Sequence, residues 1–254
     1  GDRVTVAELL EKADLVVAPD PSVALQVLHE DETLIVFDKP AGLPVHPLKP
    51  GEKGTLAGGM VARYPELAVI GDDPLFPALV HRIDTDTSGL VMAARSPEAY
   101  AFLREEFRQR RVRKEYTALV LGVVKGAGRL EHLLAHRRGP EHRMVVVEPG
   151  EKAERLKAMR AVTEYAVKRA MEACTLLDIV IHTGVTHQIR CQLAEAGWPI
   201  AGDALYGPGD TGLGLSRQFL HASGLTLAHP ATRVETRFES PLPPDLLAAL
   251  DRAG

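Results

Sequence analysis

Ten residues, 81–90, place side chains that could carry out chemistry next to one another. They read His-Arg-Ile-Asp-Thr-Asp-Thr-Ser-Gly-Leu and combine two carboxylates, an arginine, hydroxyls and a glycine. Asp84 and Asp86 are of the residue type that hydrolases use to cleave glycosidic bonds, although two carboxylates this close on a turn would not obviously flank a sugar. The same small polar residues are typical of an ordinary turn. The residue types alone leave both interpretations open.

An apolar run, Leu90–Ala94, follows this polar cluster directly. Its length and composition predict a buried strand. The polar residues are therefore expected in a loop at the entrance to a strand, a position in which a rigid scaffold often presents functional side chains.

A second segment concentrates basic side chains. Its six positive charges fall within eleven residues: Arg104, Arg108, Arg110, Arg111, Arg113 and Lys114. Only Glu105 and Glu106 oppose them in that stretch, although a solvated surface would have the same composition. The formal net charge of the chain is −4, which argues against indiscriminate coating of nucleic acid and leaves a local basic face open.

Composition limits the class of protein. A chain of 254 residues with 45% apolar residues can bury a sizeable core, as one large domain or two small lobes. The two cysteines, Cys174 and Cys191, form no Cys-x-x-Cys pair, which predicts a reduced protein without disulfides or a thiolate zinc site. We find no secretory leader and no apolar stretch near the roughly 18 residues of a membrane helix. We therefore expect a soluble, cytoplasmic protein.

The first half of the chain contains recognisable elements around the polar cluster. Leu34–Phe37 predicts a short buried strand, which the turn residues of Lys39–Gly42 end. Residues 48–77 are rich in glycine and proline and predict a long, partly irregular connection bordering the site. Ser96 and Pro97 predict a helix start, as cap and first helical residue. Arg104 and Arg108 are expected on the polar side of that helix.

The second half alternates short strands with few helices. Tyr116–Leu121 and Thr175–His182 predict strands. Thr186 is the expected cap of a helix that runs to about Ala196 and is closed by Gly197. This order of elements favours an α+β fold over a doubly wound parallel sheet.

Several short motifs also resemble, in order, those of one protein family. The matching segments are Lys39–Gly42, His81–Leu90, Lys114–Tyr116, Thr183–Arg190, Gly202–Gly207, Leu220–Ala222 and His229–Pro230. Together they resemble the RluA family of pseudouridine synthases, from about Val27 to Pro244. One departure is Val185, where relatives usually carry a basic residue, so one RNA or phosphate contact of the family is in doubt here.

The resemblance implies a fold and a domain division. We expect an α+β pseudouridine synthase fold with a mixed, mainly antiparallel central sheet, flanking helices and loops, and an active-site cleft. Residues 21–254 would form the catalytic domain. Residues 1–20 would form an N-terminal extension that resembles the end of the small S4 RNA-binding domain found before this domain in many relatives.

The resemblance also assigns roles to residues. Asp84 would be the catalytic residue, either as a nucleophile towards the sugar or as the base that starts glycal formation. Arg190 would hold this carboxylate ionised through a bidentate pair, and Tyr116 would offer an aromatic face and a hydroxyl to the uracil. Arg82 would fill the space vacated by a flipped base. Further RNA contacts are expected from Arg108, Arg110, Arg111, Arg113, Lys114, His187 and Gln188.

The expected function is isomerisation of specific uridines in structured RNA, without a cofactor or metal. His81, His187 and His221 lack a close metal-ligand spacing and are expected as hydrogen-bonding scaffold. Large-subunit ribosomal RNA is the first choice of substrate and transfer RNA the second. A catalytically inactive RNA-binding or ribosome-assembly module and a hydrolase that releases uracil are the alternatives. We expect a monomer that does not bind membranes.

Overall fold

The computed structural model describes residues 15–137, 139, 143–209 and 211–254. Residues 1–14, which make up most of the expected S4-like extension, lie outside these ranges. Within the described ranges, no helix has the length and apolar character needed to cross a membrane.

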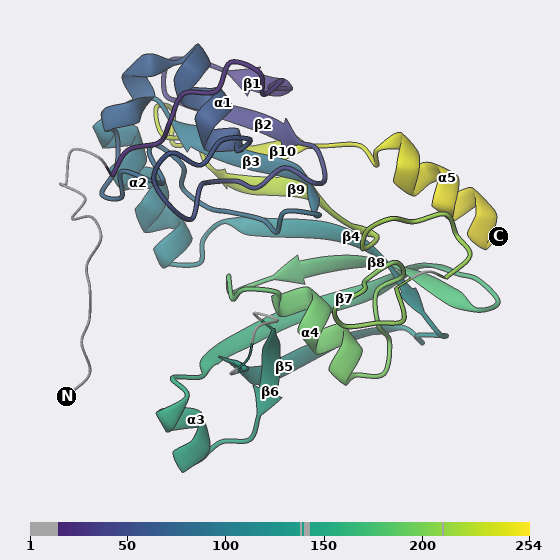
Figure 1. The fold of residues 1–254 in the computed structure, drawn as a ribbon. Coiled ribbons are helices and arrows are strands. Elements are labelled where there is room, and N and C mark those ends of the chain that lie inside the picture. Colours follow the sequence, from purple (N-terminus) through teal and green to yellow (C-terminus); the bar gives the residue numbers. More distant parts are fainter. Residues whose placement is uncertain (1–14, 138, 140–142, 210) are drawn as a thin grey trace, which may run out of the picture.

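Ten strands of the described residues form a single sheet (Figure 1). Its strand order is β1-β2-β3-β9-β4-β8-β7-β5-β6, and β10 pairs with β9. All pairs are antiparallel except β3 with β9. The strands are β1 (Val27–Glu30), β2 (Leu34–Lys39), β3 (Ser88–Ala94), β4 (Arg113–Leu121), β5 (Ala127–His136), β6 (Met144–Val147), β7 (Met159–Ala170), β8 (Cys174–Ile181), β9 (Leu220–Ala228) and β10 (Glu235–Glu239).

Helices lie against both ends of this sheet. They are α1 (Leu56–Arg63), the short 3-10 helix η2 (Pro65–Val69), α2 (Pro97–Arg108), α3 (Glu151–Arg155), α4 (Gln188–Glu195) and α5 (Pro244–Ala253). α2 contacts β3, whereas α4 packs against β5, β6 and β7 (Figure 1). The main core includes Phe37, Leu90 and Leu103, each fully buried.

Most of the expected elements are present, and two expectations are wrong. Residues 48–77 are partly irregular, as predicted, with α1 and η2 within them, but they do not border the site as expected, because none of them lines the cavities around Asp84. Thr186 does not cap α4 either. The cap is His187, which adopts a left-handed conformation and makes no side-chain cap hydrogen bond. Thr186 is too far from the first turn of α4 to act as its cap, since the helix starts at Gln188.

The glycine of the polar cluster is needed where β3 meets β9. Gly89 pairs with Ala222 in the parallel ladder and has φ +112°. A Cβ at this position would collide with the carbonyl oxygen of Ala222. Only glycine allows this approach, which joins the predicted loop–strand entrance to the middle of the sheet.

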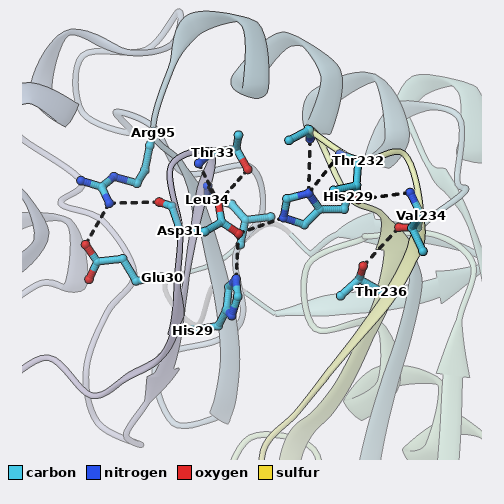
Figure 2. Close-up of polar contacts among 11 residues, drawn as sticks. His29, Glu30, Asp31, Thr33, Leu34, Arg95, His229, Thr232, Val234 and Thr236 are labelled. Atoms are coloured by element: carbon cyan, nitrogen blue, oxygen red, sulfur yellow. Dashed lines mark hydrogen bonds and ion pairs between the residues drawn. The ribbon is translucent and has the colours of Figure 1, made fainter.

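The partly buried carboxylate of Asp31 joins the β1–β2 hairpin to the β9–β10 hairpin (Figure 2). Asp31, in the β1–β2 turn, accepts hydrogen bonds on Oδ2 from Nε2 of His29 at 2.8 Å and Nε2 of His229 at 2.9 Å. Its Oδ1 accepts from the backbone and hydroxyl of Thr33 and from the Leu34 amide. His229 follows β9, so Asp31 connects the β1–β2 turn to the β9–β10 turn.

The same three side chains have the spacing of a metal site, since their ligand atoms lie within 4.8 Å of one another. Nδ1 of His229, however, faces the backbone N–H groups of Ala231 and Thr232 at 3.3 and 3.5 Å. Nδ1 is therefore the acceptor, and the proton of the neutral ring lies on Nε2, directed at Asp31. A metal would need that Nε2 lone pair, so the geometry favours a hydrogen-bonded clamp.

We predict that Asp31→Asn lowers the free energy of unfolding at neutral pH by about 1–3 kcal/mol, because an ionised acceptor is lost. Burial opposes ionisation of Asp31, but hydrogen bonds from His29, Thr33 and His229 lower its pKa overall. A lowered pKa stabilises the fold above the unfolded-state pKa of about 3.9, and this contribution disappears as the pH falls further. Urea unfolding at pH 7 and pH 3 should show a smaller difference in the free energy of unfolding between the wild type and Asp31→Asn at the lower pH. A constant difference would contradict this account.

Candidate active site

Asp84 lies at the entrance to β3, as the sequence predicts. The backbone turns between Asp84 and Thr87, whose N–H donates to the Asp84 carbonyl at 3.1 Å. The Asp84 side chain is partly exposed, with 21% of its surface accessible. Thr87 and Ser88 are buried beneath it. The turn therefore keeps the Asp84 carboxylate accessible beside the buried Thr87 and Ser88, while Thr85 and Asp86 between them are exposed.

A buried ammonium group holds this turn from below. Lys39, the last residue of β2, is fully buried and donates to the carbonyls of Pro40 (2.8 Å), Leu43 (2.7 Å) and Thr85 (2.8 Å). Burial lowers its pKa, while the charges of Asp86 and Asp84 act in the opposite direction. Since an ammonium group has three donors, all of its hydrogen-bonding capacity is used to fix two loops together.

A buried guanidinium holds the other side of the turn. Arg217 donates to the Asp86 carbonyl and the Ser88 hydroxyl, each at 3.2 Å, and pairs with both carboxylate oxygens of Asp245 at the start of α5. His221 contacts the Ser88 hydroxyl through Nδ1 (2.9 Å) and the Ser240 carbonyl through Nε2 (3.0 Å). His221 is thus the structural hydrogen-bonding group that we predict.

His81 has a similar structural position. Its Nε2 accepts the Met92 N–H at 3.1 Å, and its ring stacks on Phe107 at a centroid distance of 4.9 Å. This confirms the predicted scaffold role, because the ring ties the start of the loop to β3 and α2.

Arg190 reaches Asp84 from the first turn of α4, but its geometry differs from the expected one. Its fork binds Asp203, with Nε–Oδ2 at 2.7 Å and NH2–Oδ1 at 3.0 Å. Only NH1 is directed at Asp84, at 3.1 Å from Oδ2. The predicted bidentate pair with Asp84 is therefore wrong, because Asp203 occupies the fork and leaves a single N–H for Asp84.

The Arg190–Asp203 pair is buried on both sides, with Asp203 fully inaccessible. Burial alone would lower the pKa of Arg190, but the hydrogen bonds and charge of Asp203, together with Asp84, raise it. Burial likewise opposes ionisation of Asp203, whereas Arg190 and the N–H groups of Leu205 and Tyr206 lower its pKa. Both groups therefore stay charged, and their positions are fixed.

Tyr116 lines the same cavity as Asp84 from β4. It is nearly buried, and this burial, followed by the charge of Asp84, raises the pKa of its hydroxyl. Tyr116 is therefore a neutral aromatic side chain with its hydroxyl protonated. Ile181 and Leu220 add apolar walls to this cavity.

Two adjoining cavities share four lining residues, all of them polar. Arg82, Asp84, His187 and Arg190 line both. Arg82 is exposed, and its guanidinium approaches Nε2 of His46 at 3.4 Å. The structure thus brings together Asp84, Tyr116, Arg190 and Arg82, which are far apart in the sequence.

One predicted RNA contact does not fit its position. Gln188 is buried, and its amide bonds to Thr183, Val185, Val162 and Thr163, so it has no hydrogen-bonding capacity left for RNA. Lys114 donates to the Thr183 carbonyl at 2.9 Å, and burial lowers its pKa to about 8. Both residues secure the loop that leads into α4. This corrects the expectation that Gln188 touches RNA, whereas the contact from Lys114, which uses one of its three N–H donors here, stays a prediction.

The arginine cluster is partly neutralised. Arg108 makes a bidentate pair with Glu105, Arg111 pairs with Glu106, and Arg113 pairs with Glu115. No carboxylate of the described residues pairs with Arg110, which follows α2 in a left-handed conformation. Of the four predicted arginine contacts, Arg110 is therefore the best placed to meet a phosphate.

A larger groove, of about 1090 Å³, has Arg113, Glu115 and Thr117 of β4 in its lining. Its basic side chains are compensated by acidic neighbours: Arg129 by Glu164, Lys168 by Asp178, and Arg237 by Glu115 and Glu239. This groove offers no excess charge to a polyanion, so size alone does not make it the site.

The sequence motifs did not assign a role to several residues on which the site depends. Lys39 and Asp203 belong to matched motifs but were given no function. A buried lysine or aspartate looks like any turn residue until its partners are known. Arg217 belongs to no motif and gave no signal. Tyr206 was matched as part of Gly202–Gly207, and its contacts with His187 and Arg190 are visible only in three dimensions.

Sequence relatives point to one family. The chain is 41% identical over 213 residues to an uncharacterized RNA pseudouridine synthase of Chloroflexus aurantiacus, covering 84% of this chain and 64% of that protein. It is 38% identical over 236 residues to the ribosomal large subunit pseudouridine synthase D of Nitrosomonas europaea, covering 90% of this chain and 65% of that protein. The chain thus spans somewhat less than two thirds of the length of these two relatives.

Solved structures confirm the expected α+β fold, and a family profile adds to the sequence matches. Human RNA pseudouridylate synthase domain containing 4 superimposes with a TM-score of 0.68 at 28% identity, covering 90% of this chain and 92% of the other. Human RNA pseudouridylate synthase domain containing 1 gives 0.70 at 23% identity, covering 89% and 87%. Residues 33–195 match the RNA pseudouridylate synthase family model. From its profile match and its similarity to these relatives, the chain belongs to the RNA pseudouridylate synthase family.

Proposed function

We propose that this chain is the catalytic domain of an RNA pseudouridine synthase and that Asp84 is its catalytic residue. The observation that carries the proposal is the position of the Asp84 carboxylate, which contacts the Arg190 guanidinium in a cavity that Tyr116 also lines. The turn beneath it leaves this carboxylate accessible, while Ile83, Thr87 and Ser88 beside it are buried.

The reaction breaks the bond from ribose C1′ to uracil N1, turns the base, and joins C1′ to C5. No water is added, so one carboxylate suffices, as nucleophile or as base. Arg190 keeps Asp84 oriented through NH1 while its fork stays on Asp203. Tyr116 offers its ring to the uracil. Because its hydroxyl is protonated, it can relay the proton that leaves C5 by giving up its own hydrogen, but it does not act as a phenolate base.

The substrate is RNA, and the target base has to leave the stack to reach Asp84. Flipping a base costs on the order of a few kcal/mol unless it already lies in a loop. The exposed Arg82 guanidinium at the rim of both cavities is our candidate for filling the vacated space. His187 at the same cavities is a further contact to the substrate.

Large-subunit ribosomal RNA is the first choice of target, because one relative is named a ribosomal large subunit pseudouridine synthase D. Transfer RNA is the second. We expect the protein to act in the cytoplasm as a monomer without a metal or cofactor, and activity should persist in EDTA. Mapping pseudouridines in RNA from cells with and without this protein would identify the modified uridine.

We predict that Asp84→Asn abolishes pseudouridine formation while RNA affinity and the unfolding curve stay close to wild type. The substitution removes the charge and the nucleophile but nearly preserves the shape. Release of tritium from C5-labelled uridine in RNA measures the reaction. Appreciable turnover by the folded variant would exclude the proposed role, and release of free uracil by the wild type would identify a hydrolase instead.

We predict that Asp203→Ala lowers the free energy of unfolding by about 3–5 kcal/mol, because it leaves the buried Arg190 without its main partner. Asp178→Asn is the control, since its pair with Lys168 is half exposed and should contribute less than about 1 kcal/mol. Urea unfolding measures both. Equal effects would mean that the Arg190–Asp203 pair does not hold the site.

We also predict that Arg110→Ala weakens RNA binding. The slope of the logarithm of the binding constant against the logarithm of the salt concentration should become shallower by about 1, since one phosphate contact is lost. Arg108→Ala is the matched control. Its guanidinium is already held by both oxygens of Glu105, so its removal should change affinity little. Binding titrations of both variants at several salt concentrations measure these effects. If the two variants behave alike, Arg110 is an ordinary surface residue.

A further inference from the structure

His187 has an unusual backbone conformation beside the proposed catalytic residue. It has φ +52° and ψ +22°, in the left-handed region, and precedes the first residue of α4. Side chains other than glycine adopt this region rarely, and such strain is concentrated at functional sites. The conformation is also without an ordinary capping purpose, since His187 makes no side-chain cap hydrogen bond. Something other than helix capping therefore accounts for the direction of the ring.

The contacts of Tyr206 determine where the ring carries its proton. The Met144 N–H donates to the Tyr206 hydroxyl oxygen at 2.7 Å. The hydroxyl hydrogen then has Nδ1 of His187, at 3.1 Å, as its acceptor. Burial raises the pKa of Tyr206 to about 12, so the hydroxyl keeps this hydrogen. Nδ1 is thus the unprotonated nitrogen, and the neutral ring has its proton on Nε2.

Tyr206 is itself fixed firmly enough to impose this choice. Its backbone N–H donates to Oδ1 of Asp203 at 3.1 Å, and its ring lies under the Arg190 guanidinium at 5.3 Å. The side chain is almost fully buried. The carboxylate that binds Arg190 therefore also positions the tyrosine that binds His187.

The Nε2 side of the ring faces the reaction site. Nε2 lies 4.0 Å from Oδ2 of Asp84, too far for a hydrogen bond, and no other group of the described residues bonds to it. His187 lines both cavities that contain Asp84. Burial lowers the pKa of His187, which keeps the ring neutral at pH 7 despite the opposing charge of Asp84. An N–H donor is thus directed into the cavity without a partner.

We propose that the Tyr206 hydroxyl holds His187 in the Nε2–H form, and that this N–H donates a hydrogen bond to a carbonyl oxygen of the uracil while its bond to ribose breaks. When the N1–C1′ bond breaks, its electron pair stays on the uracil, and negative charge spreads to the carbonyl oxygens. A fixed donor stabilises this charge more than the uncharged substrate. This inference rests on the proposed function of Asp84.

Two substitutions of His187 separate this role from a structural one. The amide nitrogen of a glutamine can reach the position of Nε2, whereas an asparagine reaches only that of Nδ1. Asparagine tolerates the left-handed backbone best and can accept the Tyr206 hydrogen bond. A purely structural His187 would therefore be replaced better by asparagine, and a substrate donor better by glutamine.

The experiment is single-turnover tritium release from C5-labelled RNA at saturating protein, with RNA affinity and urea unfolding measured for each variant. We expect His187→Asn to lower the single-turnover rate about 100-fold and RNA affinity much less, as for loss of one donor to a developing anion. His187→Gln should recover part of that loss. Tyr206→Phe, which keeps the ring under Arg190, should lower the wild-type rate but add nothing in the His187→Asn background.

Nitrogen NMR of the imidazole provides a readout that does not depend on activity. The wild type should show the proton on Nε2 at pH 7. A proton on Nδ1, or a His187→Asn variant at least as active as His187→Gln, would overturn the inference. These outcomes are distinct from failure of the proposed function, which would appear as turnover by Asp84→Asn or as no tritium release by the wild type.

Discussion

The buried ion pair between Arg190 and Asp203 is the interaction on which the geometry of the site depends. Two charges removed from water are stable only when each has close partners, and here the fork of the guanidinium matches both oxygens of the carboxylate. The pair consumes two of the directions in which Arg190 can donate, and the third is directed at Asp84. Asp203 also accepts the N–H of Tyr206, so one fixed carboxylate positions Arg190 directly and His187 through Tyr206.

The turn that carries Asp84 is also fixed by buried charged side chains. Lys39 and Arg217 are buried cations whose partners are largely backbone carbonyls of the loops around the turn, with Asp245 as the carboxylate partner of Arg217. A loop on the surface is usually mobile, because few of its backbone groups are held. Here buried side chains satisfy those groups. The carboxylate is thereby held in place even though its own surface is open to a substrate.

Several of the basic side chains on α2 and along the large groove are paired with carboxylates, among them Arg108, Arg111 and Arg113. Where a cation is paired on the surface, its attraction for a phosphate is reduced. Arg82 at the cavities and Arg110 after α2 are two cations of the described residues without a carboxylate partner, and the proposed RNA binding would rest on such groups and on the shape of the site.

Local patterns in the sequence determined the elements and the position of the reactive carboxylate. Ser96 and Pro97 start α2, Gly197 follows α4, and the apolar run after Gly89 forms β3, because capping, backbone freedom and apolar periodicity act over a few residues. The motifs indicated Asp84, Tyr116 and Arg190 by resemblance. Tertiary structure alone decided that the fork of Arg190 binds Asp203, that Lys39 and Arg217 hold the turn, and that Gln188 is buried. Each of these contacts joins residues whose partner choice depends on distance, direction and access to water, and a linear pattern specifies none of the three.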